Sequence, residues 1–212
     1  MVQPETAMNT QAVSIELARL AVELVQMDDE SARRTIDRLK SEGLSREQVR
    51  EAILQTYLFD GYPTALEGLF LLRDQWPGKA APLEEPDFNQ WETWRARGRE
   101  LYQRIYGSVA DRLQEVAKAA APELAEWMVV EGYGKVLSRP GLDIRTREMV
   151  IVAILLVKGR KRQLESHIRG ALRVGVPAED LYAMLQLLRS HCKPEYRRAA
   201  WDMIDQRTSR TQ

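Results

Sequence analysis

The sequence predicts an all-α protein, a helical bundle built from two related helical repeats. Apolar residues recur at helical spacing along most of the 212 residues. No stretch shows convincing strand alternation, and β-branched residues are few outside one apolar segment, residues 146–157. The third observation is an internal repeat, in which the segment from Ile15 matches the segment from Arg147 at an offset of 132 positions.

Composition limits the classes of function and the location. Lys plus Arg and Asp plus Glu both number 31, so the net charge is zero, which argues against a dedicated nucleic-acid partner. The single cysteine, Cys192, excludes an internal disulfide and fits a reducing compartment. The longest apolar run, Met149–Val157, is far shorter than the roughly 20 residues of a membrane span, and the N-terminus lacks a signal-peptide pattern. We therefore expect a cytoplasmic protein without a membrane partner.

The first repeat is expected over residues 11–76, after a flexible tail at residues 1–10. Its four predicted helices cover residues 11–25, 28–41, 45–58 and 64–76. Asp28 or Asp29 offers an N-cap for the second helix, and Ser45 with Gln48 forms a capping-box pattern at the start of the third. The Gly61-Tyr62-Pro63 sequence separates the third helix from the fourth.

A proline-rich linker is expected at residues 77–86, where three prolines fall within ten residues. The second unit follows over residues 87–207, and a short tail ends the chain at 208–212. Its predicted helices cover residues 88–106, 109–119, 123–137, 146–157, 160–174, 177–190 and 194–206. Residues 146–157 are apolar nearly all round after the first turn, which predicts a central buried helix. Pro177 stands where a first-turn proline is tolerated.

The two repeats differ at chemically reactive positions. Glu16 of the first copy matches Glu148 of the second, whereas Thr35 stands opposite His167 and Gly61 opposite Cys192. Each copy alone would leave apolar faces bare, so the two copies are expected to pack on each other. The difference indicates either drift between two structural halves or the retention of a reactive group by the second copy alone.

His167 and Glu148 form the candidate catalytic pair. His167 stands three residues after Leu164 and four before Ala171, so it points toward the apolar face of its helix, where an imidazole needs a partner. Glu148 lies 19 residues earlier, in the first turn of the preceding helix, and contact between the two is possible. Such a pair could donate and accept a proton near neutral pH. The alternative is a core histidine whose hydrogen bonds serve structure only.

A basic turn precedes the helix of His167, at the end where the helix dipole disfavours cations. Its cations are Lys158, Arg160, Lys161 and Arg162. Together with the exposed N–H groups of the helix start, they would suit an anion such as a carboxylate, and Arg145 and Arg147 from the neighbouring helix could add to the site. The alternative is a solvated charged turn.

Other kinds of site are poorly supported by the sequence. A metal site would need histidine or cysteine ligands at ligand spacing, and no such pattern is present. A glycine-rich phosphate loop is also missing, so no cofactor and no metal are expected. His191-Cys192 is weak evidence for thiol chemistry, because no fixed base neighbours the thiol in sequence. The aromatics Trp91, Trp94, Tyr102 and Tyr106 are expected in the core or in a subunit contact.

The stretch from Glu131 to Leu185, which includes SRPGLDIRTRE and the later LESHIRGALRVG, resembles the carboxymuconolactone decarboxylase family. RGRELYQRIYG, at residues 97–107, is similar to that family's N-terminal helix. REAILQTYLFDGYPTALEGL, in the first copy, resembles the family's closing motif, whereas the second copy has HCKPEY at residues 191–196. The resemblance implies a bundle of the alkylhydroperoxidase D-like type, with one wall of the pocket altered or supplied by the other copy or another subunit.

The resemblance also separates two kinds of chemistry. The alkylhydroperoxidase D-like branch uses a Glu, a CxxC pair and a His; Glu148 and His167 match the Glu and His, but Arg160 and Gln163 stand at the two cysteine positions. That branch's disulfide cycle is therefore not available. The decarboxylase branch lacks the cysteine pair and acts without a cofactor on a small lactone that bears carboxylates.

By this resemblance, Arg160 and Arg162 would hold a substrate carboxylate, together with Arg145 and Gln163 as further substrate-binding residues. His167 would shuttle a proton to the carbanion or enolate left when carbon dioxide departs, and Glu148 would orient it. The leading hypothesis is therefore a cofactor-independent lyase that decarboxylates a small carboxylated lactone or a related intermediate of aromatic catabolism.

Two further hypotheses stay open at this point. One is a non-catalytic helical oligomer with a binding or scaffolding role. The other is a peroxidase or antioxidant that uses Cys192 with an external thiol, which the missing CxxC pair disfavours. The family commonly forms trimers or hexamers of helical units, so a chain with two units is expected to form a homo-oligomer, preferably a trimer, with a dimer or hexamer as alternatives.

Overall fold

The computed structural model describes residues 10–79 and 90–209 of the chain. All regular secondary structure in these two ranges is helical, which confirms the predicted all-α fold. Residues 1–9 of the predicted N-terminal tail, 80–86 of the predicted linker and 210–212 of the predicted C-terminal tail lie outside the described residues. The last helix extends one residue into that C-terminal tail, to Thr208.

The first group of helices comprises α1 (Thr10–Val25), α2 (Asp29–Ser41), α3 (Arg46–Leu54) and α4 (Tyr57–Gln75). Asp28 caps α2 by accepting a hydrogen bond from the Ser31 N–H, and Ser45 forms the predicted capping box with Gln48. The start of α4 differs from the prediction. Residues 57–60 already belong to α4, and Gly61 adopts a φ of 89° that bends the helix there, a conformation open to glycine because it has no Cβ.

The second group comprises α5 (Gln90–Tyr106), a 3₁₀ turn η1 (Gly107–Val109), α6 (Ala110–Ala120), α7 (Pro122–Trp127) and a π-helix η2 (Met128–Leu137). The sequence predicted one helix over 123–137, and the structure divides it into α7 and η2. α5 and η2 cross very closely at two glycines. A Cβ on Gly98 would lie 2.1 Å from the Val129 carbonyl oxygen, and a Cβ on Gly134 would lie 1.9 Å from the Trp94 carbonyl oxygen.

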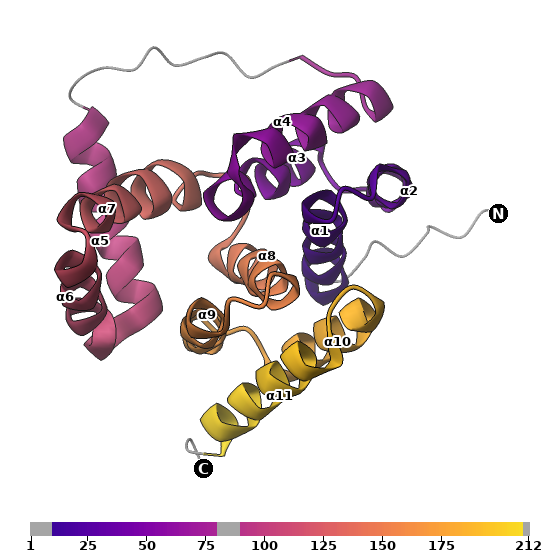
Figure 1. Ribbon diagram of the computed structural model, residues 1–212. Coiled ribbons are helices and arrows are strands. Elements are labelled where there is room, and N and C mark those ends of the chain that lie inside the picture. The colour runs from indigo at the N-terminus through magenta and orange to yellow at the C-terminus, as the bar shows by residue number, and fades with distance from the viewer. Residues whose placement is uncertain (1–9, 80–89, 210–212) are drawn as a thin grey trace.

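The third group comprises α8 (Ile144–Val157), α9 (Lys161–Arg173), α10 (Ala178–Leu187), a 3₁₀ turn η3 (Leu188–Ser190) and α11 (Pro194–Thr208). Pro177 is the N-cap residue of α10 and not part of its first turn. Figure 1 shows α8 in the middle of the molecule, with the first group, the second group and α9–α11 arranged around it. Residues 149–154 of α8 are at most 1% exposed, as the uniformly apolar pattern predicted.

Helices of the first and third groups correspond in their positions along the sequence. α9 begins and ends 132 positions after α2, and the glycine that follows each helix, Gly43 or Gly175, has a positive φ of 84° or 91°. α1 packs against α8, and the hydroxyl groups of Ser14 and Thr146, also 132 positions apart, lie 2.8 Å from each other. A contact between matching residues is expected on a two-fold axis. The duplication itself stays our interpretation of these parallels.

Candidate acid–base site

His167 lies in the middle of α9 and faces the protein interior. It is 7% exposed, and Leu164, Ile168 and Ala171 on the same side of the helix are buried as well. Its Nδ1 atom lies 3.0 Å from Oε2 of Glu148, which is fully buried in the first half of α8. α8 and α9 form an antiparallel hairpin, so the beginning of one helix lies beside the later part of the next. This arrangement brings together the two residues that the sequence selected.

Gly170 leaves room for this pair to be covered by α5. A Cβ at Gly170 would lie 2.6 Å from Cγ2 of Ile105 and 3.0 Å from Oε2 of Glu148. The matching position of the first repeat holds Arg38, whose guanidinium lies 2.7 Å from the Glu16 carboxylate. An arginine thus pairs with Glu16, whereas a histidine is hydrogen-bonded to Glu148, 132 positions later.

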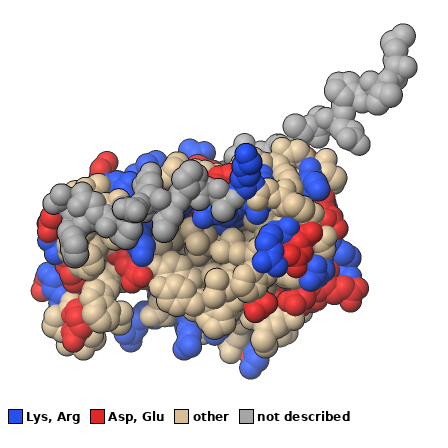
Figure 2. All heavy atoms as spheres, turned by 90° about the horizontal axis from the view of Figure 1, so that it is seen from above, with Lys and Arg blue, Asp and Glu red and all other residues tan. Residues whose placement is uncertain are grey.

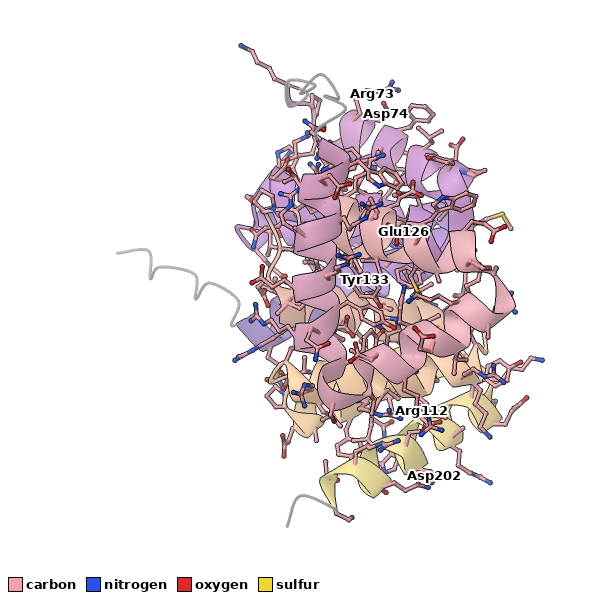
Figure 3. The ribbon with its side chains drawn as sticks, turned by 90° about the vertical axis from the view of Figure 1, so that its left-hand side faces the viewer. Arg73, Asp74, Arg112, Glu126, Tyr133 and Asp202 are labelled. Carbon is pink, nitrogen blue, oxygen red and sulfur yellow. The ribbon has the colours of Figure 1, made fainter. Side chains whose placement is uncertain are left out.

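Two tyrosines continue the hydrogen-bonded chain on the other side of the imidazole. The Tyr106 hydroxyl lies 3.3 Å from Nε2 of His167 and 2.7 Å from the Tyr133 hydroxyl. Tyr106 lies at the end of α5 and Tyr133 lies in η2. Figure 3 labels Tyr133 near the middle of the molecule, between Glu126 above and Arg112 below. Sequence reasoning assigned Tyr106 to the core or a subunit contact and did not consider Tyr133, because no local spacing connects either residue to His167.

The environment keeps both phenols neutral. Burial, strengthened by the nearby Glu148 carboxylate, raises the pKa of Tyr106 well above its usual value, and burial together with Tyr106 does the same to the pKa of Tyr133. A neutral Tyr106 can donate to Nε2 while accepting from Tyr133, and Glu148 then accepts from the Nδ1–H of His167. We assign this tautomer from the hydrogen-bond pattern. The other oxygen of Glu148, Oε1, is buried and has no partner among the described residues.

The start of α4 lies close to His167. The ring of Phe59, in α4, makes an edge-on contact with the imidazole at a centroid distance of 6.1 Å. The next residue, Asp60, forms an ion pair with Lys158 at the end of α8. Both residues directly precede the Gly61 motif that resembles the family's closing motif. A segment of the same chain, the start of α4, therefore lies beside His167.

The predicted anion-binding residues are not all brought together. Arg160 is the N-cap residue of α9 and makes no capping hydrogen bond with its side chain. It is exposed, as are Arg162 and Gln163 in the first turn. Arg145 instead donates from Nε to the Val174 carbonyl oxygen, 3.3 Å away at the other end of α9. Because a 13-residue helix is about 20 Å long, Arg145 and Arg160 do not share one anion site within a chain. The antiparallel hairpin is the physical reason.

Arg147 also does not join the basic turn. It is fully buried, and its Nη2 atom lies 3.0 Å from Oε2 of Glu51, a fully buried carboxylate of α3 that also binds Arg139 at 2.9 Å. Gln55 accepts a further hydrogen bond from Arg147. Burial lowers the pKa of Arg147, and the charge and hydrogen bond of Glu51 oppose this effect. Arg147 and Glu51 therefore form a buried ion pair between the first group of helices and α8.

The remaining reactive groups give no second site of this kind. Cys192 is partly buried, and burial raises the pKa of its thiol, which disfavours the reactive thiolate. Within residues 10–79 and 90–209, no group of three or more His, Cys, Asp or Glu side chains is arranged to hold a metal ion. No helix in the same ranges has the length and apolar character needed to cross a membrane.

Comparison with known proteins finds a family model that matches part of the chain. Residues 122–204 match the model of the carboxymuconolactone decarboxylase family, which confirms the resemblance noted in the sequence. The 4-carboxymuconolactone decarboxylase of Acinetobacter baylyi is 40% identical over 53 residues, which are 25% of this chain and 40% of that protein.

Two yeast proteins are similar over a longer part of the chain. Peroxisomal protein 2 of Saccharomyces cerevisiae is 26% identical over 161 residues, which cover 64% of this chain and 57% of that protein. Peroxisomal protein 2 of Schizosaccharomyces pombe is 24% identical over 139 residues, which cover 63% of each chain. The matched segments thus span less than two thirds of each of these three relatives.

Proposed function

We propose that this protein is a cofactor-independent lyase that decarboxylates a small carboxylated lactone or a related compound. The match of residues 122–204 to the carboxymuconolactone decarboxylase family supports this proposal. The observation that carries the proposal is the hydrogen bond between the buried Glu148 carboxylate and the His167 imidazole. A histidine oriented by a carboxylate in a largely dry environment is a common arrangement for moving protons near neutral pH.

In the proposed reaction, the C–C bond to the substrate carboxylate breaks and its electron pair stays on the carbon that remains. Carbon dioxide leaves, and the resulting carbanion or enolate takes a proton from Nε2 of a protonated His167. Glu148 stabilises the imidazolium through Nδ1 and holds the ring in place. The 3.3 Å contact between Nε2 and Tyr106 is long for a hydrogen bond, so Nε2 is the ring atom that a substrate can engage by displacing Tyr106. Solvent returns the proton to His167 after each turnover.

The start of α9 is the proposed place for the substrate carboxylate. Arg160 and Gln163 lie seven and four residues before His167, hence near the same side of α9, and Arg162 adds a second cation. The unpaired N–H groups of a helix start favour an anion as well. Arg145 lies at the other end of α9, so a role for it in substrate binding would require a second subunit.

A second candidate function is a non-catalytic helical oligomer with a binding or scaffolding role. One observation favours this function: both ring nitrogens of His167 already have protein hydrogen-bond partners, and its side chain is 8% exposed. A histidine of this kind can serve packing alone. Its replacement would then change stability without changing any turnover.

Release of carbon dioxide from 4-carboxymuconolactone and from a panel of β-keto acids tests the proposal. We expect turnover by the full-length protein and a loss of at least about 100-fold in kcat for His167→Gln. The matched control is His191→Gln, because His191 bonds only Gln26 through its side chain among the described residues. Failure of the unaltered protein to decarboxylate any compound of the panel would favour the non-catalytic function, and equal turnover by both variants would remove His167 from the mechanism.

The assembly and the location are part of the proposal. We propose a homo-oligomer, with a trimer preferred, and light scattering after size-exclusion chromatography distinguishes it from a dimer or hexamer. We propose the cytoplasm as the location, and the names of the two yeast relatives make the peroxisome the alternative compartment. Microscopy of a fluorescently tagged chain distinguishes the two.

A further inference from the structure

A hollow with a volume of about 330 Å³ lies between α4 and η2, and neither His167 nor Glu148 is among its lining residues. Its apolar lining consists of Leu54, Ala65, Leu66, Leu69 and Val136. Its remaining lining consists of Arg50, Tyr57, Tyr62, Lys135 and Arg139. The volume is at the lower end of the range of small-molecule pockets, which typically combine apolar and aromatic walls with a few polar groups.

The aromatic wall of this hollow is built around a stacked pair. The rings of Tyr57 and Tyr62 lie 5.1 Å apart at an interplanar angle of 22°. The Tyr57 hydroxyl is anchored by donating to Glu131 at 2.9 Å, whereas Tyr62 is 64% exposed. Exposure of so much aromatic surface is unfavourable in water, and the ring can stack with a planar ligand.

The cationic side is formed by Arg50, Arg139 and Lys135. Arg139 donates only through Nε to Glu51 within the described residues, so the two terminal nitrogens of its guanidinium remain for another acceptor. Lys135 is exposed and forms no ion pair in that part of the chain; its ammonium lies 5.4 Å from the centre of the Trp94 ring. Two cations with donors to spare beside an apolar wall favour a ligand that carries an anionic group.

Lys135 lines a second hollow as well as the first. A neighbouring hollow of about 370 Å³ is lined by Trp91, Trp94, Trp127, Val130, Glu131 and Lys135. Figure 2 looks onto the α4 side of the molecule and shows uncharged surface across the middle of this face, with both basic and acidic side chains around it. Tyr62, Leu66 and Phe70 of α4 are exposed apolar side chains on this side.

We propose that the hollow between α4 and η2 binds a small aromatic carboxylate, with its ring against Tyr62 and its carboxylate between Lys135 and Arg139. A concave site with arginine donors is better suited to such a molecule than to the flat apolar face of a second copy of the chain. None of its lining residues contacts His167 or Glu148 in the hydrogen-bond and ring contacts described above, so this site does not depend on the proposed decarboxylase activity.

Isothermal titration of the full-length protein with 2-naphthoate tests the site, with the uncharged 2-naphthamide as the matched ligand. We expect 2-naphthoate to bind with a Kd below about 1 mM and at least about ten times more tightly than the amide. Equal binding of the two ligands, or a Kd of 2-naphthoate above about 1 mM, would overturn the proposal.

Four variants locate the binding. Lys135→Gln and Tyr62→Ser are each expected to weaken 2-naphthoate binding at least tenfold, and both side chains are exposed, so folding should be kept. The matched control is Lys118→Gln, since Lys118 is an exposed lysine outside this hollow and is expected to leave the Kd unchanged. His167→Gln is also expected to leave the Kd unchanged, which separates this site from the decarboxylase site. Unchanged binding in Lys135→Gln and Tyr62→Ser would refute the site, above all if Tyr62→Ser instead changed the oligomeric state.

Discussion

Removal of one hydroxyl group, in Tyr106→Phe, tests the hydrogen-bonded chain around His167. The substitution keeps the ring and its contacts with the rings of Tyr102 and Tyr133. It removes a hydrogen-bond partner from two buried groups. The Tyr133 hydroxyl loses a 2.7 Å hydrogen bond and Nε2 of His167 loses a 3.3 Å one. Tyr133 is 4% exposed and His167 is 7% exposed, so water does not readily replace the lost partner.

The size of the effect follows from these two bonds. Leaving one buried polar group unsatisfied costs about 1–3 kcal/mol, and the longer bond to His167 contributes less than the short bond to Tyr133. We therefore expect Tyr106→Phe to lower the free energy of unfolding by about 1–4 kcal/mol. The double variant Tyr106→Phe/Tyr133→Phe is expected to cost less than the sum of the two single variants, because it removes both partners of the short bond.

Tyr102→Phe is the matched control. Tyr102 lies one turn earlier on α5, is also buried, and packs against the same two tyrosine rings, but its hydroxyl has no hydrogen-bond partner among the described residues. Its removal is expected to change the free energy of unfolding by less than about 0.5 kcal/mol. Urea unfolding of all variants at one protein concentration measures these differences, since an oligomer's stability depends on concentration. Equal losses for Tyr102→Phe and Tyr106→Phe would refute the hydrogen-bonded chain.

Three further predictions concern the buried charges, the helix crossing and pH. Glu51→Gln leaves the buried Arg147 without its carboxylate and should lower the free energy of unfolding by about 3–5 kcal/mol; a loss below 1 kcal/mol in urea unfolding would contradict this. Gly134→Ala should lower the free energy of unfolding by at least about 1–3 kcal/mol, because the new Cβ would lie 1.9 Å from the Trp94 carbonyl oxygen and the backbone must move. Gly132→Ala is the control, because a Cβ there has no atom within 4 Å. Equal thermal stability of the two variants would contradict the close crossing. Because burial raises the pKa values of the folded state's tyrosines, the unfolded chain loses its phenolic protons first, so stability should fall as pH rises above about 10. The fall should be smaller in Tyr106→Phe, and urea midpoints that do not change between pH 8 and 11 would disprove this explanation.

Local sequence patterns determined the helical fold and the direction of the key side chain. Hydrophobic spacing, the Asp28 and Ser45 caps and the uniformly apolar segment of α8 depend on neighbours within four or five residues, so they can be read without the fold. The same short-range geometry indicated that His167 faces the core. The pairing of His167 with Glu148 required only one more step, since the two helices are joined by a short turn.

The tertiary structure alone decided which distant groups surround this pair. The Tyr106–Tyr133 chain exists because α5 and η2 approach closely at Gly98 and Gly134, a crossing that no local pattern encodes. Burial of Arg147 against Glu51 likewise depends on a partner 96 residues away, which is why the sequence instead offered that arginine as an addition to the anion site. Helix formation depends on contacts along one segment, whereas the composition of a site depends on how separate segments cross, and that is determined by packing over the whole chain.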